Sequence, residues 1–431
     1  METEIFRTLE SEVRSYCRKF PVVFKRAEGS TIVDSEGKSY IDFFCSASSL
    51  NYGHNEPTIK SEVIRYLQQN GVCTTLDLHT EAKRAFLETF QKLILGPRNL
   101  RYKMQFTSPS GASAVEASIK LARRMTGRDG IVSFTNGFHG VTAGALSLTG
   151  NKYHRQDSMW RSSVQLPFDG YLGDIQNTMD YFKKLIEDPS SGFDLPAAVI
   201  VEPVQAEGGI RIASNRWLKD LRSITRAHGI LLIMDEIQTG CGRTGPFFSF
   251  ERAGIVPDIV CLAKSIGGLG LPMAIVLISE ALDKWNPGED SGTFCGNNLA
   301  FVAATAALKK YWSESGFSSH FELTGDVLRG RLELIGSKAL DHIRDIRGVG
   351  MMFGLEFYDE EIAGEIVADC FSNGLIVAAC GSRDEVIKII PALNISAGEL
   401  AEGLDVLEMS VQRLVQKHRM KSRSKVQAIY C

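Results

Sequence analysis

Short, continuously apolar segments alternate with helix-like segments over residues 104–264, and this alternation limits the fold more than any other feature of the chain. The apolar segments have the length of strands and cover residues 104–108, 130–138, 197–204, 230–236 and 257–264. Segments 113–127 and 215–229, between them, have helical spacing. Strands that are apolar on both faces and separated by helices are typical of a parallel sheet covered on both sides. The sequence therefore predicts an α/β fold.

The two ends of the chain have shorter elements of mixed type, and residues 4–20 are predicted to form one helix. We therefore expect a large domain over residues 50–315. A smaller α+β domain is expected to combine residues 1–49 with residues 316–418. Residues 419–431 form a basic, polar tail that is expected to end the chain irregularly.

Composition excludes several classes of function. A net charge of −3 over 431 residues gives no electrostatic basis for binding nucleic acid. The longest apolar runs, such as residues 229–234, are too short to cross a membrane, and the charged first residues do not resemble a signal peptide. The nine cysteines are scattered and form no CxxC pair. We expect reduced thiols in a cytoplasmic protein, with no disulfide framework and no metal site.

Two of the predicted strands end in residues suited to a phosphate and to a flat ring. Ser110, Gly111 and Ala112 follow the first strand and begin a helix, where free backbone N–H groups can bind phosphate. Phe138 and His139 lie in a glycine-flanked turn after the next strand, where an aromatic ring can stack on a heterocycle. Each feature also has a simpler interpretation: a serine helix cap in the first case, and a buried phenylalanine beside a solvent-facing histidine in the second.

Two further strands end in an acid and an amine. Asp235 ends a buried apolar run, and such a carboxylate stays ionised only beside a positive partner, for which a protonated ring nitrogen is suited. Gln238 follows three residues later and can reach the same ligand. Lys264 ends the next predicted strand, in the segment CLAKSIGG. The simpler interpretations are a capping carboxylate and a surface lysine.

Ligands of open parallel sheets bind at the carboxyl ends of the strands, so these four strand ends are expected to meet. A phosphate cradle, a stacking ring, an acid for a ring nitrogen and an amine together describe pyridoxal 5′-phosphate bound to a lysine. No GxGxxG motif follows the first strand of a βαβ unit, so a nicotinamide site has little support.

Three motifs give the chain a resemblance to a known family, over nearly its whole length. They are VIVEPVQAEGG (199–209), MDEIQTGCGRTG (234–245) and PDIVCLAKSIGG (257–268). The chain resembles the class III, or omega, aminotransferases of pyridoxal phosphate fold type I, and the resemblance implies a mostly parallel seven-stranded sheet. Within the family it is most similar to diaminobutyrate–2-oxoglutarate transaminases, through the segments 9–24, 40–57, 134–151 and 292–301.

The resemblance implies a role for each residue at the cofactor. Lys264 would be the Schiff-base lysine and the proton shuttle, and Asp235 would pair with the pyridinium nitrogen. Gln238 would contact the 3-oxygen of the ring. Phe138 would stack on the ring with His139 beside it, and the turn of Ser110, Gly111 and Ala112 would hold the phosphate.

Other implied roles concern the partner subunit and the substrate. Thr293 resembles a threonine that reaches the phosphate of the neighbouring subunit, which implies a homodimer with shared active sites, or a higher oligomer built from it. Glu202 and Glu207 match the two acids of the family's EPxQxEGG motif, and the second acid typically pairs with an arginine as a gate. This chain has Lys388 at the arginine position. Lys388 is either the partner of Glu207 or a surface lysine at a strand end.

The resemblance also implies the reaction, with amino acids and a keto acid or aldehyde as substrates. L-Glutamate would give its amino group to L-aspartate 4-semialdehyde, yielding L-2,4-diaminobutyrate and 2-oxoglutarate. One alternative is another acceptor or donor of the family, such as 4-aminobutyrate, ornithine or a specialised-metabolite aldehyde. A second is an aminomutase or epimerase that consumes no keto acid, and a third is a non-catalytic protein with the same fold.

Overall fold

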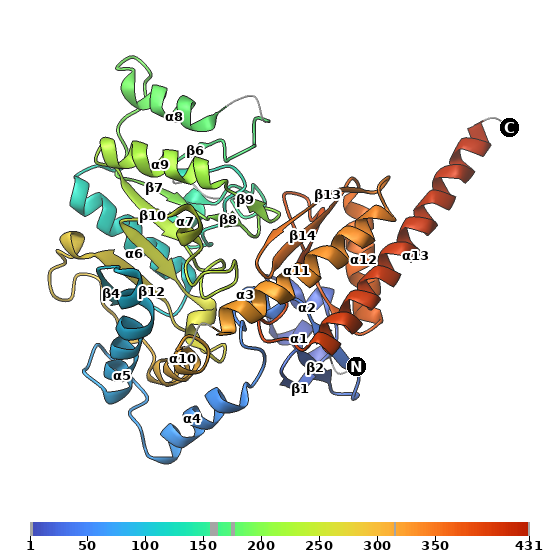
Figure 1. The fold of residues 1–431 in the computed structure, drawn as a ribbon, viewed down its shortest axis with the longest axis horizontal. Helices are drawn as coiled ribbons and strands as arrows, with labels where there is room; N and C mark the ends of the chain where they lie inside the picture. The colour runs from blue at the N-terminus through green and yellow to red at the C-terminus, as the bar shows by residue number, and fades with distance from the viewer. Residues whose placement is uncertain (1–2, 156–162, 174–176, 314–315, 430–431) are drawn as a thin grey trace.

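A seven-stranded sheet forms the centre of the larger part of the molecule (Figure 1). The structure, a computed structural model, describes residues 3–155, 163–173, 177–313 and 316–429. The strand order is β4-β12-β11-β10-β7-β5-β6. The strands are β4 (Tyr102–Phe106), β5 (Ile131–Phe134), β6 (Ser163–Leu166), β7 (Ala198–Val201), β10 (Leu231–Asp235), β11 (Ile259–Leu262) and β12 (Ile275–Ser279).

The sheet is mostly parallel, as predicted. β11, β10, β7, β5 and β6 pair in parallel, whereas β12 is antiparallel to both of its neighbours, β11 and β4. The α/β prediction is therefore confirmed, but β6 and β12 were not predicted. β12 is a short buried apolar run like the others, and β6 is a half-exposed edge strand of four residues with weak patterning.

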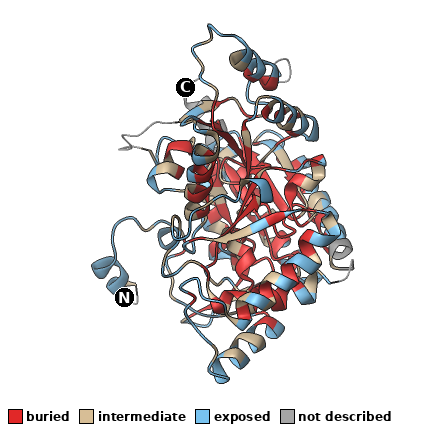
Figure 2. Ribbon diagram, turned by 90° about the vertical axis from the view of Figure 1, so that its left-hand side faces the viewer, coloured by how far each residue is buried: buried red, intermediate tan, exposed pale blue. Residues whose placement is uncertain are grey.

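Both faces of this sheet are buried beneath helices. On β10, Leu232 and Met234 join one hydrophobic core, and Ile233 joins the core on the opposite face. Figure 2 shows the buried residues concentrated around these central strands. The helices of this part are α4 (Pro57–Gln68), α5 (Glu81–Phe90), α6 (Gly111–Thr126), α7 (Ala143–Leu148), α8 (Thr178–Glu187), α9 (Asn215–Ala227) and α10 (Asn298–Tyr311). Burial on two faces explains why the strands are apolar without alternation.

Segments from both chain ends lie side by side in the other part of the molecule (Figure 1). One sheet has the order β1-β2-β3-β15, and in it β15 pairs in parallel with β3 although they are far apart in sequence. A second sheet has the order β13-β14-β17-β16. The strands are β1 (Phe24–Glu28), β2 (Thr31–Asp34), β3 (Ser39–Asp42), β13 (Ile343–Val349), β14 (Met352–Phe357), β15 (Leu375–Ile376), β16 (Ala378–Cys380) and β17 (Val386–Ile389). The helices are α1 (Glu4–Leu9), α2 (Tyr16–Lys19), α3 (Cys45–Ser48), α11 (Gly316–Ser337), α12 (Glu360–Ser372) and α13 (Ala397–Ile429). A two-stranded ribbon, β8 (Val204–Gln205) with β9 (Arg211–Ile212), completes the strands of the described chain.

Two local predictions for the chain ends are wrong. Residues 4–20 form two short helices, α1 and α2, and neither buries a residue, so no packing holds them as one. The tail from residue 419 continues helix α13 up to Ile429. Arg419 fixes the start of this part, because its Nε donates to Asp341 Oδ2 at 2.7 Å.

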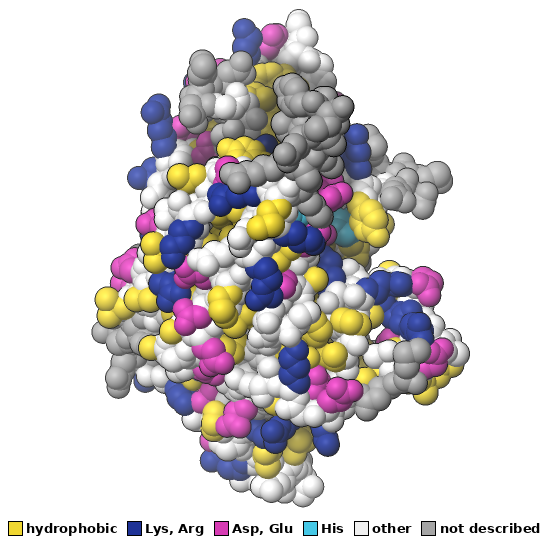
Figure 3. All heavy atoms as spheres, turned by 90° about the vertical axis from the view of Figure 1, so that its right-hand side faces the viewer, with side chains coloured by type: hydrophobic (Ala, Val, Ile, Leu, Met, Phe, Trp, Pro, Cys, Tyr) yellow, Lys and Arg dark blue, Asp and Glu magenta, His cyan; other side chains and the backbone are white. Residues whose placement is uncertain are grey.

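The surface, the helices and the cysteines bear on the classes of function that composition was expected to exclude. On the face in Figure 3, the coloured basic and acidic side chains are interspersed. Within the described ranges, no helix is long and apolar enough to span a membrane, and no group of histidine, cysteine or acidic side chains could hold a metal ion. The cysteines that the structure describes are free thiols.

Candidate active site

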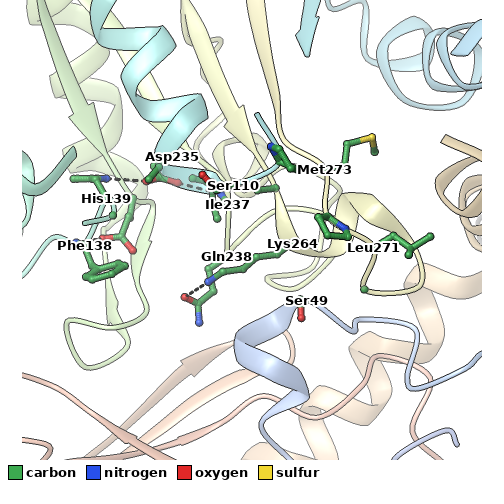
Figure 4. Close-up of a pocket in the computed structure, with 18 residues that line it drawn as sticks. Ser49, Ser110, Phe138, His139, Asp235, Ile237, Gln238, Lys264, Leu271 and Met273 are labelled. Carbon is green, nitrogen blue, oxygen red and sulfur yellow. Dashed lines mark hydrogen bonds and ion pairs between the residues drawn. The ribbon is translucent and has the colours of Figure 1, made fainter. Parts of the chain in front are cut away.

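A cavity of about 340 Å³ lies at the carboxyl ends of the parallel strands (Figure 4). Its volume is within the range of small-molecule sites, roughly 300–1,000 Å³. The lining residues include most of the predicted cofactor residues: Ser110, Gly111, Ala112, Phe138, His139, Glu202, Asp235, Gln238 and Lys264. Residues from five separate segments therefore meet in one place, as the position of strand ends in an open sheet predicts.

Asp235 and His139 form a buried pair at one side of the cavity. Asp235 is the last residue of β10, and its Oδ2 lies 2.8 Å from His139 Nδ1. Burial lowers the pKa of His139, but the hydrogen bond and charge of Asp235 outweigh it and raise that pKa. The other oxygen, Oδ1, accepts from the backbone N–H of Ile237 at 3.1 Å. The simpler interpretation of His139 as a solvent-facing side chain is wrong, because only 3% of it is exposed.

Lys264 follows β11 and is half-buried, so the interpretation as a surface lysine is wrong. Its Nζ donates to Gln238 Oε1 at 2.9 Å. Burial is the main reason that its pKa falls to about 8; Lys388 lowers it further, and Glu207 opposes the change. The backbone of Lys264 has φ of +55°, a left-handed conformation that costs a residue with Cβ about 1–2 kcal/mol.

The unfilled hydrogen-bonding groups of the cavity fit pyridoxal phosphate. Gln238 is 7% exposed, and its Nε2 has no hydrogen-bond partner among the described residues. Helix α6 begins at the cavity with Ser110 as its N-cap, so the first N–H groups of the helix face a potential anion. A Cβ at Gly111 would lie 2.9 Å from the Ile237 side chain, so the turn requires a small residue. A phosphate and a ring oxygen are the groups that these donors would satisfy.

Glu202, the first acid of the EPxQxEGG motif, is hydrogen-bonded to the backbone of Phe138. Its Oε1 accepts from the backbone N–H of Phe138 at 2.9 Å. Burial raises the pKa of Glu202 to about 8, and the charge of Asp235 contributes, whereas His139 opposes it. Glu202 therefore fixes the backbone that presents the Phe138 ring to the cavity.

Lys388 and Glu207 form an ion pair outside the residues that line this cavity. Lys388 lies on β17 with a side chain that is 0% exposed, so its interpretation as a surface lysine is wrong. Burial would raise the pKa of Glu207, but Lys388 and then Lys264 outweigh it and lower that pKa to about 2. Burial would lower the pKa of Lys388, yet Glu207 raises it. The ammonium also lies 5.5 Å from the centre of the Phe44 ring.

Thr293 is the one predicted cofactor residue that the structure does not bring to the cavity. It is exposed, in the loop before α10, and it does not line the cavity of its own chain.

Sequence reasoning missed residues on the side of the cavity facing Lys264. Ser49 lies directly after α3, and the turn of Gly270, Leu271, Pro272 and Met273 precedes β12. Figure 4 shows Ser49 at the end of the α3 ribbon, across from Lys264. The glycine and proline of the turn were a usable signal, whereas Ser49 had none, because its position depends on a chain segment far away in sequence.

Comparisons with known proteins identify the family to which the chain belongs. The family model described as aminotransferase class-III matches residues 14–411. The chain is 49% identical to a diaminobutyrate–2-oxoglutarate transaminase of Bordetella parapertussis, over 95% of both chains. It is also 49% identical to one of Halomonas elongata, over 96% of this chain and 99% of the relative. The crystal structure of the ornithine aminotransferase from Toxoplasma gondii ME49 has the same fold, with a TM-score of 0.83 at 24% identity, covering 97% of this chain and 96% of that one. The chain therefore belongs to the class III aminotransferases, and its cofactor is pyridoxal 5′-phosphate.

Proposed function

We propose that the protein transfers the amino group of L-glutamate to the terminal carbon of L-aspartate 4-semialdehyde, giving L-2,4-diaminobutyrate and 2-oxoglutarate. The observation that carries the proposal is the meeting of Lys264, Asp235 and Gln238 in one cavity. The acceptor is inferred from the named relatives, which match nearly the whole chain at 47–49% identity.

Lys264 is the proposed proton carrier of the reaction. Pyridoxal phosphate, when bound, supplies an aldehyde that links to amines and a ring that withdraws electrons from the substrate carbon. The freed Lys264 amine removes the α-proton of the donor and returns a proton to the product. A pKa of about 8 leaves part of this amine neutral near neutral pH, which a general base requires.

Asp235 is the proposed partner of the ring nitrogen, and His139 orients it. Because His139 Nδ1 lies 2.8 Å from one carboxylate oxygen, rotation of Asp235 is restricted. Gln238 would contact the ring oxygen, and Phe138, positioned by Glu202, would cover one face of the ring. The turn of Ser110, Gly111 and Ala112 would hold the phosphate.

Glu207 and Lys388 are the proposed residues for the far end of the substrates. Glutamate brings a second carboxylate, whereas diaminobutyrate brings an ammonium together with its carboxylate. A buried pair offers one charge to each, since Lys388 attracts a carboxylate and Glu207 attracts an ammonium. Lysine is a point charge and not a bidentate fork, so its selection among dicarboxylates depends less on geometry than that of an arginine.

A second copy of the chain is needed to complete the proposed site. Thr293 is exposed in its own chain and would reach the phosphate of the partner, so we include a homodimer with shared active sites in the proposal. The division into a domain of residues 50–315 and a smaller one from both ends, and a cytoplasmic location, remain predictions of the same kind.

Addition of L-glutamate to the yellow holoenzyme tests the donor half-reaction. We expect the visible absorbance of the lysine-bound cofactor to disappear and 2-oxoglutarate to form in equal amount. An unchanged spectrum would contradict the choice of donor. Turnover of an amino acid without any keto acid would instead indicate an aminomutase or an epimerase.

A further inference from the structure

The turn before Ser49 has a backbone that side-chain-bearing residues rarely adopt. Cys45, Ser46, Ala47 and Ser48 have φ values of 47°, 45°, 57° and 66°, so four consecutive residues are left-handed. Each Cβ crowds the following carbonyl in this conformation, so the surrounding structure must hold it in place. Asp42 holds its beginning, because Oδ1 accepts the N–H groups of Phe44 and Cys45 at 2.8 and 2.9 Å.

Ser265 holds the other end of the turn. It is 4% exposed, and its hydroxyl donates to Ser48 O at 2.5 Å and accepts from Asn51 N–H at 3.2 Å. Ser48 and Asn51 are each 1% exposed, so water cannot replace these bonds without a rearrangement. Ser265 directly follows Lys264, whose own φ is +55°.

We propose that Ser265 is a positioning residue that ties the left-handed backbone of Lys264 to the left-handed turn of residues 45–48. The turn leads into Ser49, which lines the cavity across from Lys264 (Figure 4). The hydroxyl therefore fixes the cofactor lysine and the facing wall relative to each other. This inference rests on the proposed role of Lys264.

Two substitutions distinguish a positioning role of Ser265 from a general contribution to stability. One removes the hydroxyl, and the other relieves the strain of the turn. In Ser265→Ala the end of the turn loses its hydrogen bond while Asp42 still holds the beginning, and the wall loses this link to the residue next to Lys264. Glycine adopts positive φ without the Cβ clash, so Ser46→Gly removes the strain at one of the four residues and lowers the cost of keeping the turn left-handed without Ser265. Ser46 suits this purpose because its side chain is exposed and its φ is 45°.

The experiment titrates apoenzyme with pyridoxal 5′-phosphate and follows the absorbance of the lysine-bound cofactor, together with kcat, KM and thermal unfolding. Thr225→Val is the matched control, because this buried hydroxyl also bonds to a carbonyl, Arg222 O, but on helix α9 away from the cavity. We expect Ser265→Ala to weaken cofactor binding about tenfold, the effect of one buried hydrogen bond, and to lower kcat more than it raises KM. The double variant Ser265→Ala/Ser46→Gly should recover most of the cofactor affinity and most of kcat. Ser265→Thr keeps the hydroxyl, so it should lose less cofactor affinity and less kcat than Ser265→Ala.

Cofactor binding by Ser265→Ala within twofold of the wild type would overturn the proposal. So would a double variant no better than Ser265→Ala, or an equal loss of cofactor affinity in Thr225→Val, because the effect would then follow stability alone. Failure of the wild-type protein to form the lysine-bound absorbance would reject the role of Lys264 itself, which distinguishes that outcome from failure of this inference.

Discussion

The cofactor end of the site and the Lys388–Glu207 pair are built in different ways. Asp235 ends β10 and Lys264 follows the neighbouring strand β11 of the same sheet, where Asp235 is in register with Cys261. Glu207 lies after β8, and Lys388 lies on β17 of another sheet, which combines β13, β14, β16 and β17. One end is thus fixed by a single buried sheet edge, whereas the other depends on packing between two parts of the molecule.

This difference separates chemistry from selection of substrates. The sheet edge provides the rigid support that proton transfer at the cofactor requires. The pair joins elements of two different sheets and lies outside the residues that line the cavity, so we expect a substrate charge to compete with one partner for the other. Variants at the first end should affect turnover, and variants at the second should affect the choice of substrate and stability.

The largest effect is expected for Lys264→Ala. General acid–base catalysis by one side chain contributes about 10²–10⁴-fold, so kcat should fall by at least about a thousandfold when the covalent link is also lost. The lysine-bound absorbance should disappear as well. Lys284→Ala is a control at another lysine of the same part of the chain. Turnover by Lys264→Ala at the wild-type rate would overturn the assignment of the whole site.

Asp235→Asn should have the next largest effect. The amide keeps the size of the side chain but removes the charge, so the ring nitrogen is no longer held positive and the pKa of His139 falls. Removal of one charged group that stabilises the transition state costs about 10²–10³-fold in kcat, and we expect a loss of this size. NMR titration of His139 in the apoenzyme measures the fall of its pKa independently of kcat. An unchanged kcat would show that this carboxylate does not act on the ring.

A smaller effect, on stability and on KM, is expected for Lys388→Met. Glu207 would lose its buried partner, at a cost of about 3 kcal/mol in the free energy of unfolding. The pKa of Glu207 is about 2 in the folded protein against 4.5 as the ordinary value, so this contribution is complete above pH 4.5 and disappears as the pH falls toward 2. The difference in the free energy of unfolding between wild type and Lys388→Met, measured with urea, should therefore reach about 3 kcal/mol at pH 7 and be smaller at pH 4.

Two comparisons sharpen that result. Lys417→Met removes an exposed partner of Glu365 and should cost less than about 1 kcal/mol. Lys388→Arg keeps the charge, so it should retain more glutamate activity than Lys388→Met. Equal unfolding free energies for Lys388→Met and wild type at pH 7 would contradict a buried pair.

The smallest effect couples the two ends through charge. Lys388 lowers the pKa of Lys264 and Glu207 raises it. Lys388→Met should therefore move this pKa above about 8, and Glu207→Gln should move it below. The pH dependence of Lys264 labelling by an amine-specific reagent in the apoenzyme measures the shift. Movement in the same direction in both variants would show that the pair acts through structure and not through charge.

Much of the cofactor end was predictable from sequence, because each residue follows a recognisable strand and strand ends of a parallel sheet converge. The pairing of His139 with Asp235 was not predictable, since it depends on the direction in which a turn presents the ring. The burial of Lys388 was equally unpredictable. Its strand, β17, is short, and the sequence does not show that it lies between β14 and β16 in the interior of a sheet. The left-handed turn of residues 45–48 contains no glycine, so no local signal marks it.

Transfer of isotope from ¹⁵N-labelled L-glutamate tests the central claim most directly. The holoenzyme is incubated with the labelled donor and L-aspartate 4-semialdehyde, and the product is examined by mass spectrometry and NMR. The account predicts 2,4-diaminobutyrate with ¹⁵N at carbon 4 and an equal amount of 2-oxoglutarate. Unlabelled product, label at carbon 2, or no product while another aldehyde or keto acid is aminated would contradict it.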